Sequence, residues 1–164
     1  VAMGFHQPSS DLPLPAGTEF IYHPPQSRLR EIYAQCDAWL FGSRVEGFGM
    51  PILEAMACRT PVIGTPAGAA PELLIDGAGL LVPLEDPEAM AQAIVRMCRM
   101  SETQWRTISD RAYAKATGYS WDDAAAGFEA ALYRAIDRVK SGDLVQYPGY
   151  RGVDRNIKLP AGVR

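Results

Sequence analysis

The chain has 164 residues, 48% hydrophobic and 21% charged, proportions typical of one ordinary globular domain with a sizeable core. Its 16 basic and 19 acidic residues give a formal charge of −3, which provides no electrostatic footprint for a nucleic-acid partner. No apolar run reaches the ~18 residues that a membrane-spanning helix needs. We therefore expect neither a nucleic-acid partner nor a transmembrane segment, and leave open peripheral membrane contact of a full protein.

Strand and helix patterns alternate along the first half of the chain. Apolar runs predict strands at residues 1–5, 19–22, 38–41, 61–64 and 79–82. Helix patterns separate the later strands: one capped by Ser27, one over residues 51–58 and a short one over 71–75. Strands that are apolar throughout and alternate with helices predict an α/β fold, a Rossmann-like parallel sheet with helices on both faces.

The second half is predicted to end in several helices. One begins after Glu85 or Asp86, and a second, with a capping box formed by Ser101 and Gln104, runs to about residue 117. Ser120 is the predicted cap of a last helix over about 121–139. We assign residues 1–140 to a partial nucleotide-sugar-binding domain and residues 141–164 to an extended or disordered tail.

The three cysteines are odd in number and are not arranged for a metal. Cys36, Cys58 and Cys98 form no Cys-x-x-Cys pair and no cluster with histidine. We interpret them as reduced core residues of a cytoplasmic protein, and we expect no metal site.

The segment from Glu46 to Glu54, EGFGMPILE, is the most informative motif. Its glycines let the main chain approach a ligand closely, and Pro51 fits the first turn of a helix. Main-chain N–H groups at such a helix start attract anions, while carboxylates accept hydrogen bonds from sugar hydroxyls. The pattern indicates a site for a polyhydroxyl ligand that carries phosphate.

The ordered residues of this segment resemble the signature of the retaining, GT-B-fold glycosyltransferases of group 1 (family 4). The similarity extends roughly over residues 18 to 135. It is carried by Leu29, Tyr33, Cys36, Asp37, Glu46, Gly47, Phe48, Gly49, Pro51, Glu54, Ala55, Thr60, Pro61, Thr65, Gly68, Pro71, Glu72, Asp76, Gly77 and Gly79.

The resemblance implies a role for each matching residue. Glu46 would be the catalytic-site carboxylate that holds the donor sugar ring, and Glu54 would bind the ribose hydroxyls. The remaining contacts would come from Gly47, Phe48, Gly49 and Met50 to the sugar and distal phosphate, and from Tyr22 and His23 to the base. The donor substrate would be a nucleotide-diphosphate sugar, with no cofactor and no metal.

One departure from the family pattern concerns the diphosphate. The family usually presents an Arg and a Lys to it from the first strand and helix of this domain, yet no basic residue precedes Arg28 here. We therefore expect a fragment that lacks the first β-α unit and the N-terminal acceptor domain. A natural half-size protein that needs a partner is the alternative. Either way, the isolated chain is expected to be inactive.

Other interpretations of the same residues stay open. Glu54 and Glu72 can each complement a helix dipole, and Glu46 can be a solvated loop charge. At the level of function, the alternatives are a non-catalytic nucleotide-sugar-binding or interaction module and an epimerase or phosphorylase of the same fold. The sequence does not identify the donor sugar, the base or the acceptor.

Overall fold

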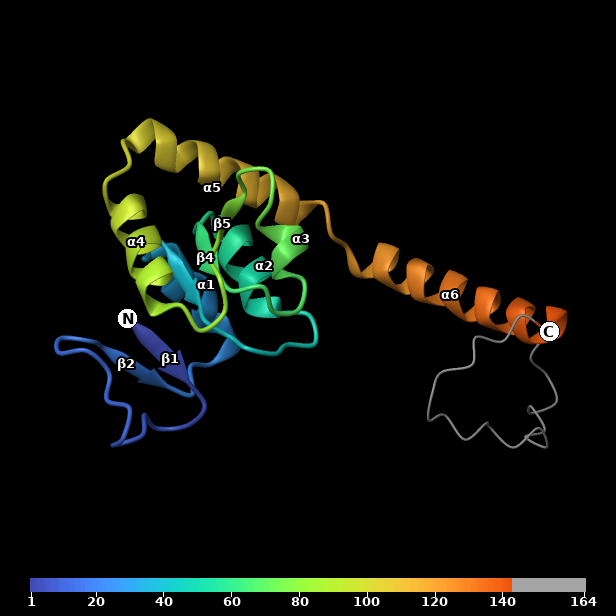
Figure 1. Ribbon diagram of the computed structural model, residues 1–164, viewed down its shortest axis with the longest axis horizontal. Coiled ribbons are helices and arrows are strands. Elements are labelled where there is room, and N and C mark those ends of the chain that lie inside the picture. The colour runs from blue at the N-terminus through green and yellow to red at the C-terminus, as the bar shows by residue number, and fades with distance from the viewer. Residues whose placement is uncertain (143–164) are drawn as a thin grey trace. The chain divides into compact units, whose positions relative to one another are not determined.

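The structure is a computed structural model that describes residues 1–142, so the tail prediction for residues 143–164 lies outside the described residues. It divides into two compact units, Val1–Ser120 and the part that starts at Trp121. The elements, drawn in Figure 1, are β1 (Ala2–Gly4), β2 (Phe20–Tyr22), α1 (Gln26–Ala34), β3 (Trp39–Phe41), α2 (Met50–Ala57), β4 (Val62–Gly64), α3 (Ala70–Leu73), β5 (Gly79–Leu81), α4 (Pro87–Cys98), α5 (Glu102–Thr117) and α6 (Trp121–Ser141).

All five strands of the described part pair in parallel, as the sequence predicts. They form a two-stranded sheet, β1-β2, and a three-stranded sheet, β3-β4-β5, rather than one continuous sheet. In the larger sheet Trp39 pairs with Val62, and Val62 pairs with Gly79. The expected α/β architecture is confirmed, and the break in the sheet falls between β1 and β3.

The central strand β4 divides the core into two layers because its successive side chains point to opposite faces. Val62 packs in the cluster that contains Ile52 and Met56 of α2. Ile63, its neighbour, packs with Met97 of α4. Both β4 residues are fully buried, so helices cover the two faces of this sheet.

The helix starts of the C-terminal half follow the sequence signals closely. The Asp86 side chain accepts a hydrogen bond of 2.9 Å from the Ala89 N–H at the start of α4. Ser101 and Gln104 form both halves of the predicted capping box of α5. Ser27, by contrast, is not a cap: it lies inside α1, whose N-cap is Pro25. Pro25 has extended backbone angles and directs the chain into the helix one residue earlier than predicted.

The expectation that all three cysteines lie in the core is wrong for Cys98, which is exposed on α4. Cys36 and Cys58 are half-buried, and all three are free. Cys98 occupies a helix that packs on the sheet with only part of its circumference, so apolar spacing alone did not fix which side it faces.

The second unit contains α6, which begins at Trp121 as predicted and ends at Ser141. No residue of α6 is buried, so its apolar residues, among them Phe128 and Tyr133, are exposed. Among the described residues, no helix has both the length and the apolar character that crossing a bilayer requires.

Candidate functional site

The segment 46–54 connects β3 to α2. Gly49 is the N-cap of α2 and has left-handed backbone angles, with φ of 93°. A Cβ atom there would lie 3.2 Å from the Phe41 ring and 3.3 Å from the Ile52 side chain. The position therefore requires glycine for both conformation and space. No side chain caps this helix start, and Pro51 lies in its first turn as predicted.

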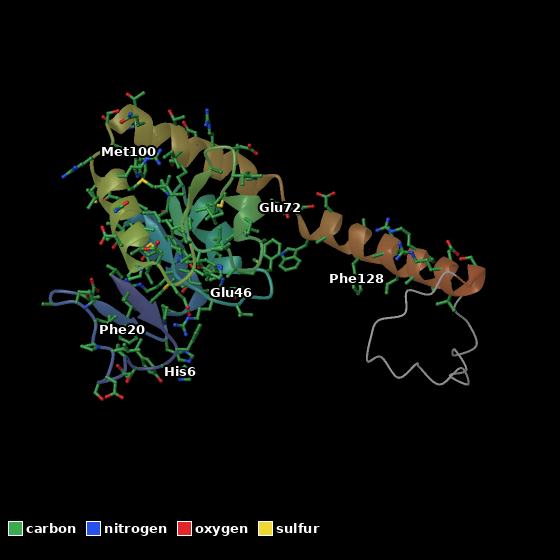
Figure 2. All side chains as sticks on the ribbon, viewed as in Figure 1. His6, Phe20, Glu46, Glu72, Met100 and Phe128 are labelled. Atoms are coloured by element: carbon green, nitrogen blue, oxygen red, sulfur yellow. The ribbon has the colours of Figure 1, made fainter. Side chains whose placement is uncertain are left out.

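Glu46 is held in place by the residue that opens the same loop. The Ser43 hydroxyl donates a 2.7 Å hydrogen bond to Glu46 Oε1. Ser43 is itself fixed, because its carbonyl accepts a 2.5 Å hydrogen bond from the Thr65 hydroxyl at the end of β4. The carboxylate of Glu46, labelled in Figure 2, is therefore tied to the sheet through two side chains. The sequence analysis did not assign Ser43 a role.

The loop that follows β4 clamps the same turn from its other side. The Ala69 N–H donates to the Phe48 carbonyl at 2.8 Å. Gly68 has φ of +56°, and a Cβ atom there would lie 2.5 Å from the Phe48 oxygen and 3.0 Å from Glu46 Cβ. Gly68 thus permits a contact between two main chains that no other residue would allow. This close approach fixes the path of the turn.

Glu54 lies in α2 and is oriented by a buried tyrosine of α1. The Tyr33 hydroxyl donates a 2.9 Å hydrogen bond to Glu54 Oε2, and Tyr33 is 1% exposed. The Tyr33 ring packs edge-on against Trp39 at 4.8 Å, while its carbonyl accepts a 2.7 Å hydrogen bond from the Thr60 hydroxyl. The sequence placed Tyr33 on the apolar face of a helix but gave no sign that its hydroxyl would reach Glu54.

Burial, together with the hydrogen bond to Glu54, raises the pKa of the Tyr33 hydroxyl above its ordinary value of 10.0. The unfolded chain releases this proton near pH 10 while the folded chain keeps it, so stability contributed by Tyr33 is present below pH 10 and is lost as the pH rises. We predict that the difference in unfolding free energy between the native chain and Tyr33→Phe shrinks by about 1.4 kcal/mol per pH unit above pH 10. Denaturant titrations of both proteins from pH 8 to pH 11 test this, and a constant difference would contradict it.

Tyr22 and His23 lie at the end of β2. His23 has φ of 52°, a left-handed conformation that a non-glycine residue adopts at a cost. Its N–H donates to the Gly4 carbonyl at 2.9 Å, and its ring packs edge-on against Phe5 at 4.8 Å. The contacts that fix His23 therefore run to β1 and its loop. Both Tyr22 and His23 are exposed to solvent.

Two further charged residues near the turn already have partners. Arg44 pairs with Glu85 at 3.1 Å in a solvent-exposed salt bridge between the loops that follow β3 and β5. Glu72 accepts a 3.3 Å hydrogen bond from the Tyr119 hydroxyl, and its carbonyl accepts one of 2.6 Å from Lys115. Glu72 thus joins α3 to α5. Within residues 1–142, no three acidic, histidine or cysteine side chains gather as a metal site requires.

The arrangement as a whole matches the place where open parallel sheets bind ligands. Such ligands lie outside the carboxyl ends of the strands. The turn with Glu46 follows β3, and the clamping loop with Gly68 follows β4. Two oriented carboxylates beside an uncapped helix start can accept hydroxyl hydrogen bonds and attract an anionic group.

Comparison with known proteins identifies the family. The family model described as "Glycosyl transferases group 1" matches residues 6–100. The chain is 33% identical to the O-antigen chain mannosyltransferase B of Escherichia coli over 105 residues, 63% of this chain and 27% of that protein. It is 36% identical to a D-inositol 3-phosphate glycosyltransferase of Mycobacterium leprae over 117 residues, 69% of this chain and 27% of the relative.

Solved structures agree with this result. Sucrose-phosphate synthase of Thermosynechococcus elongatus has a TM-score of 0.61 and 30% identity over 74% of this chain and 30% of its own. The Anabaena protein HepE in complex with UDP-glucose has a TM-score of 0.55 and 30% identity over 61% of this chain and 27% of its own. The chain thus spans less than a third of these relatives, and it has the α/β fold of GT-B glycosyltransferases. It belongs to the group 1 glycosyltransferases.

Proposed function

We propose that this chain is the donor-binding part of a retaining glycosyltransferase that transfers a sugar from a nucleotide-diphosphate sugar to an acceptor. One observation carries the proposal: Glu46 and Glu54 are each oriented by a hydroxyl, from Ser43 and Tyr33, on either side of an uncapped helix start. Two carboxylates held in this way suit the hydroxyls of a sugar and a ribose. The helix start suits the diphosphate that lies between them.

The proposed chemistry follows from these positions. Glu46 is the catalytic-site carboxylate on the donor sugar ring, and Glu54 binds the ribose. As the bond between the sugar and the diphosphate breaks, the electron pair leaves with the diphosphate oxygen, and the acceptor hydroxyl bonds to the sugar carbon and gives up its proton. Preorganised N–H donors stabilise the charge that develops on the leaving group. Those donors are assigned to Gly47, Phe48, Gly49 and Met50. In this proposal no metal or cofactor takes part.

The nucleotide base is assigned to the end of β2. Tyr22 and His23 expose their side chains there, and the left-handed conformation of His23 sets the direction of the main chain after the strand. The bound UDP-glucose in the solved structure of HepE supports a nucleotide sugar as the class of donor. The identity of the base is decided by experiment.

The whole protein would add what these 164 residues do not contain. Because the chain spans about 27% of the mannosyltransferase and of the M. leprae relative, we propose that an N-terminal acceptor domain completes the enzyme. We also propose a cytoplasmic location, which the free cysteines of the described part support.

Calorimetry with UDP-, GDP-, ADP- and dTDP-sugars tests the donor assignment. We predict that one of these classes binds the 164-residue chain with 1:1 stoichiometry, and that Glu46→Ala weakens this binding. Glu88→Ala, which removes an exposed carboxylate from the first turn of α4, is the matched control and should bind normally. Turnover by the isolated chain should stay at background. Absence of binding for all four classes, or robust unassisted turnover, would contradict the proposal.

A further inference from the structure

The first strand, β1, offers hydrogen-bonding groups on the side that β2 does not occupy. The Ala2 N–H donates to the Glu19 carbonyl, and the Gly4 carbonyl accepts from the His23 N–H, so these two residues bond toward β2. Successive residues of a strand direct their main-chain groups to opposite sides. The N–H and carbonyl of Met3 therefore face away from β2, where the described residues form no ladder.

The strand β3 presents an equivalent edge. The Trp39 N–H donates to the Pro61 carbonyl, and the Phe41 carbonyl accepts from the Thr65 N–H, so both residues bond toward β4 and its flanks. The main-chain groups of Leu40 consequently face the other way. Within residues 1–142, β3 pairs with β4 alone. Leu40 is 48% exposed, an unusual value for the middle of an apolar strand.

One cavity joins the two edges. It has a volume of about 1150 Å³, and both Met3 and Leu40 line it. This exceeds the roughly 300–1,000 Å³ of ordinary small-molecule pockets. Its walls include Ile94 and Met97 of α4 and Trp105 of α5, while Asp37 and Glu102 are its acidic members. A polypeptide with an apolar centre suits such walls better than a polar ligand does.

The order of the strands gives this cavity a place in a known topology. Doubly wound sheets have the classic strand order 3-2-1-4-5-6. With an added strand in the cavity, the two sheets would read β2-β1-added strand-β3-β4-β5, which is that order with the added strand at position 1. We propose that the cavity is a slot for one extended, apolar β-strand, supplied by polypeptide outside these 164 residues, that joins both sheets through Met3 and Leu40.

Two observations favour this occupant over others. The relatives are more than three times longer than the matched region, so their chains contain ample polypeptide from which such a strand can come. In addition, the Trp39 side chain, which lines the cavity, has a buried Nε1 without a hydrogen-bond partner among the described residues. A buried donor of this kind is costly, and an inserted main chain would offer acceptors.

The slot can be tested without a nucleotide sugar. The probe is a fluorescein-labelled peptide, acetyl-KVIVVIK-amide, titrated into the 164-residue chain and followed by fluorescence anisotropy and by hydrogen exchange. We expect saturable 1:1 binding and slower exchange of the Met3 and Leu40 amides. The same peptide with N-methylated central residues cannot form the ladder and should bind at least tenfold more weakly.

The matched protein variant is Leu40→Pro. Proline is tolerated in an edge strand where its missing N–H would face outward, so the variant should fold, as circular dichroism can verify. It should bind the peptide at least tenfold more weakly. Should it fail to fold, the N-methylated peptide and the exchange data still decide. Absent binding, equal binding of both peptides, or dimerisation of the chain that protects the same two amides would overturn the proposal. Donor binding is measured separately, so either proposal can fail alone.

Discussion

Gly68→Ala is expected to lower the free energy of unfolding by about 2–4 kcal/mol, because it adds left-handed backbone strain to an overlap with fixed main chain. Gly68 has φ of +56°, and its new Cβ would lie 2.5 Å from the Phe48 carbonyl oxygen and 3.0 Å from Glu46 Cβ. The Phe48 carbonyl cannot withdraw without losing its hydrogen bond from Ala69. Urea denaturation of the native chain and the variant measures the effect.

Gly42→Ala is the matched control for this prediction. Gly42 follows β3 in the same loop region, has no positive φ, and has open space around the position of a Cβ atom. Its substitution should change stability by no more than about 0.5 kcal/mol. Equal effects of the two substitutions would mean that the close approach of Gly68 to Phe48 does not constrain the fold.

The same substitution also separates stability from ligand binding. At a temperature where Gly68→Ala is fully folded, the displaced turn should still weaken nucleotide-sugar binding, because Glu46 and the Phe48 main chain move with it. Calorimetry on the folded variant measures this directly. Native affinity in a destabilised variant would show that the turn relaxes without loss of its proposed ligand contacts.

Local chemistry explains which parts of the structure the sequence could predict. The capping box of Ser101 and Gln104 and the cap at Asp86 act over three residues, so the pattern contains the whole interaction. The strand positions were equally accessible because fully buried strands are apolar throughout, as Val62 and Ile63 show. The turn at Gly49 was predicted because glycine and proline restrict the chain wherever they occur.

Contacts between distant segments were beyond the sequence pattern. Tyr33 reaches Glu54 across 21 positions, and in the sequence its place on the apolar face of α1 looks like that of any core residue. Thr65 reaches Ser43 across 22 positions in the same way. The separation into two sheets was also missed, because an apolar strand pattern does not reveal whether both edges of a strand are paired. Such features depend on which segments the fold brings together.

Among the proposed ligand contacts, Glu54→Ala should cause one of the largest losses of nucleotide-sugar affinity, about 10- to 150-fold. This corresponds to about 1.5–3 kcal/mol for hydrogen bonds to a charged group. The substitution also leaves the buried Tyr33 hydroxyl without its acceptor, which costs about 1–3 kcal/mol of stability. Glu54→Gln keeps an acceptor for that hydroxyl, so it should recover much of the stability without the affinity. Calorimetry and urea denaturation of both variants separate the two effects.

A double-mutant cycle then tests whether Tyr33 acts through Glu54. Tyr33→Phe alone frees the carboxylate from its 2.9 Å hydrogen bond and should weaken nucleotide-sugar binding about 2- to 12-fold, the range of one ordinary hydrogen bond. In the Glu54→Ala background the same change should have almost no effect on binding, because the group that Tyr33 orients is gone. Tyr113→Phe on α5 removes a hydroxyl elsewhere and should leave affinity unchanged. An equal loss from Tyr33→Phe in both backgrounds would show that Tyr33 supports the site through packing, not through the carboxylate.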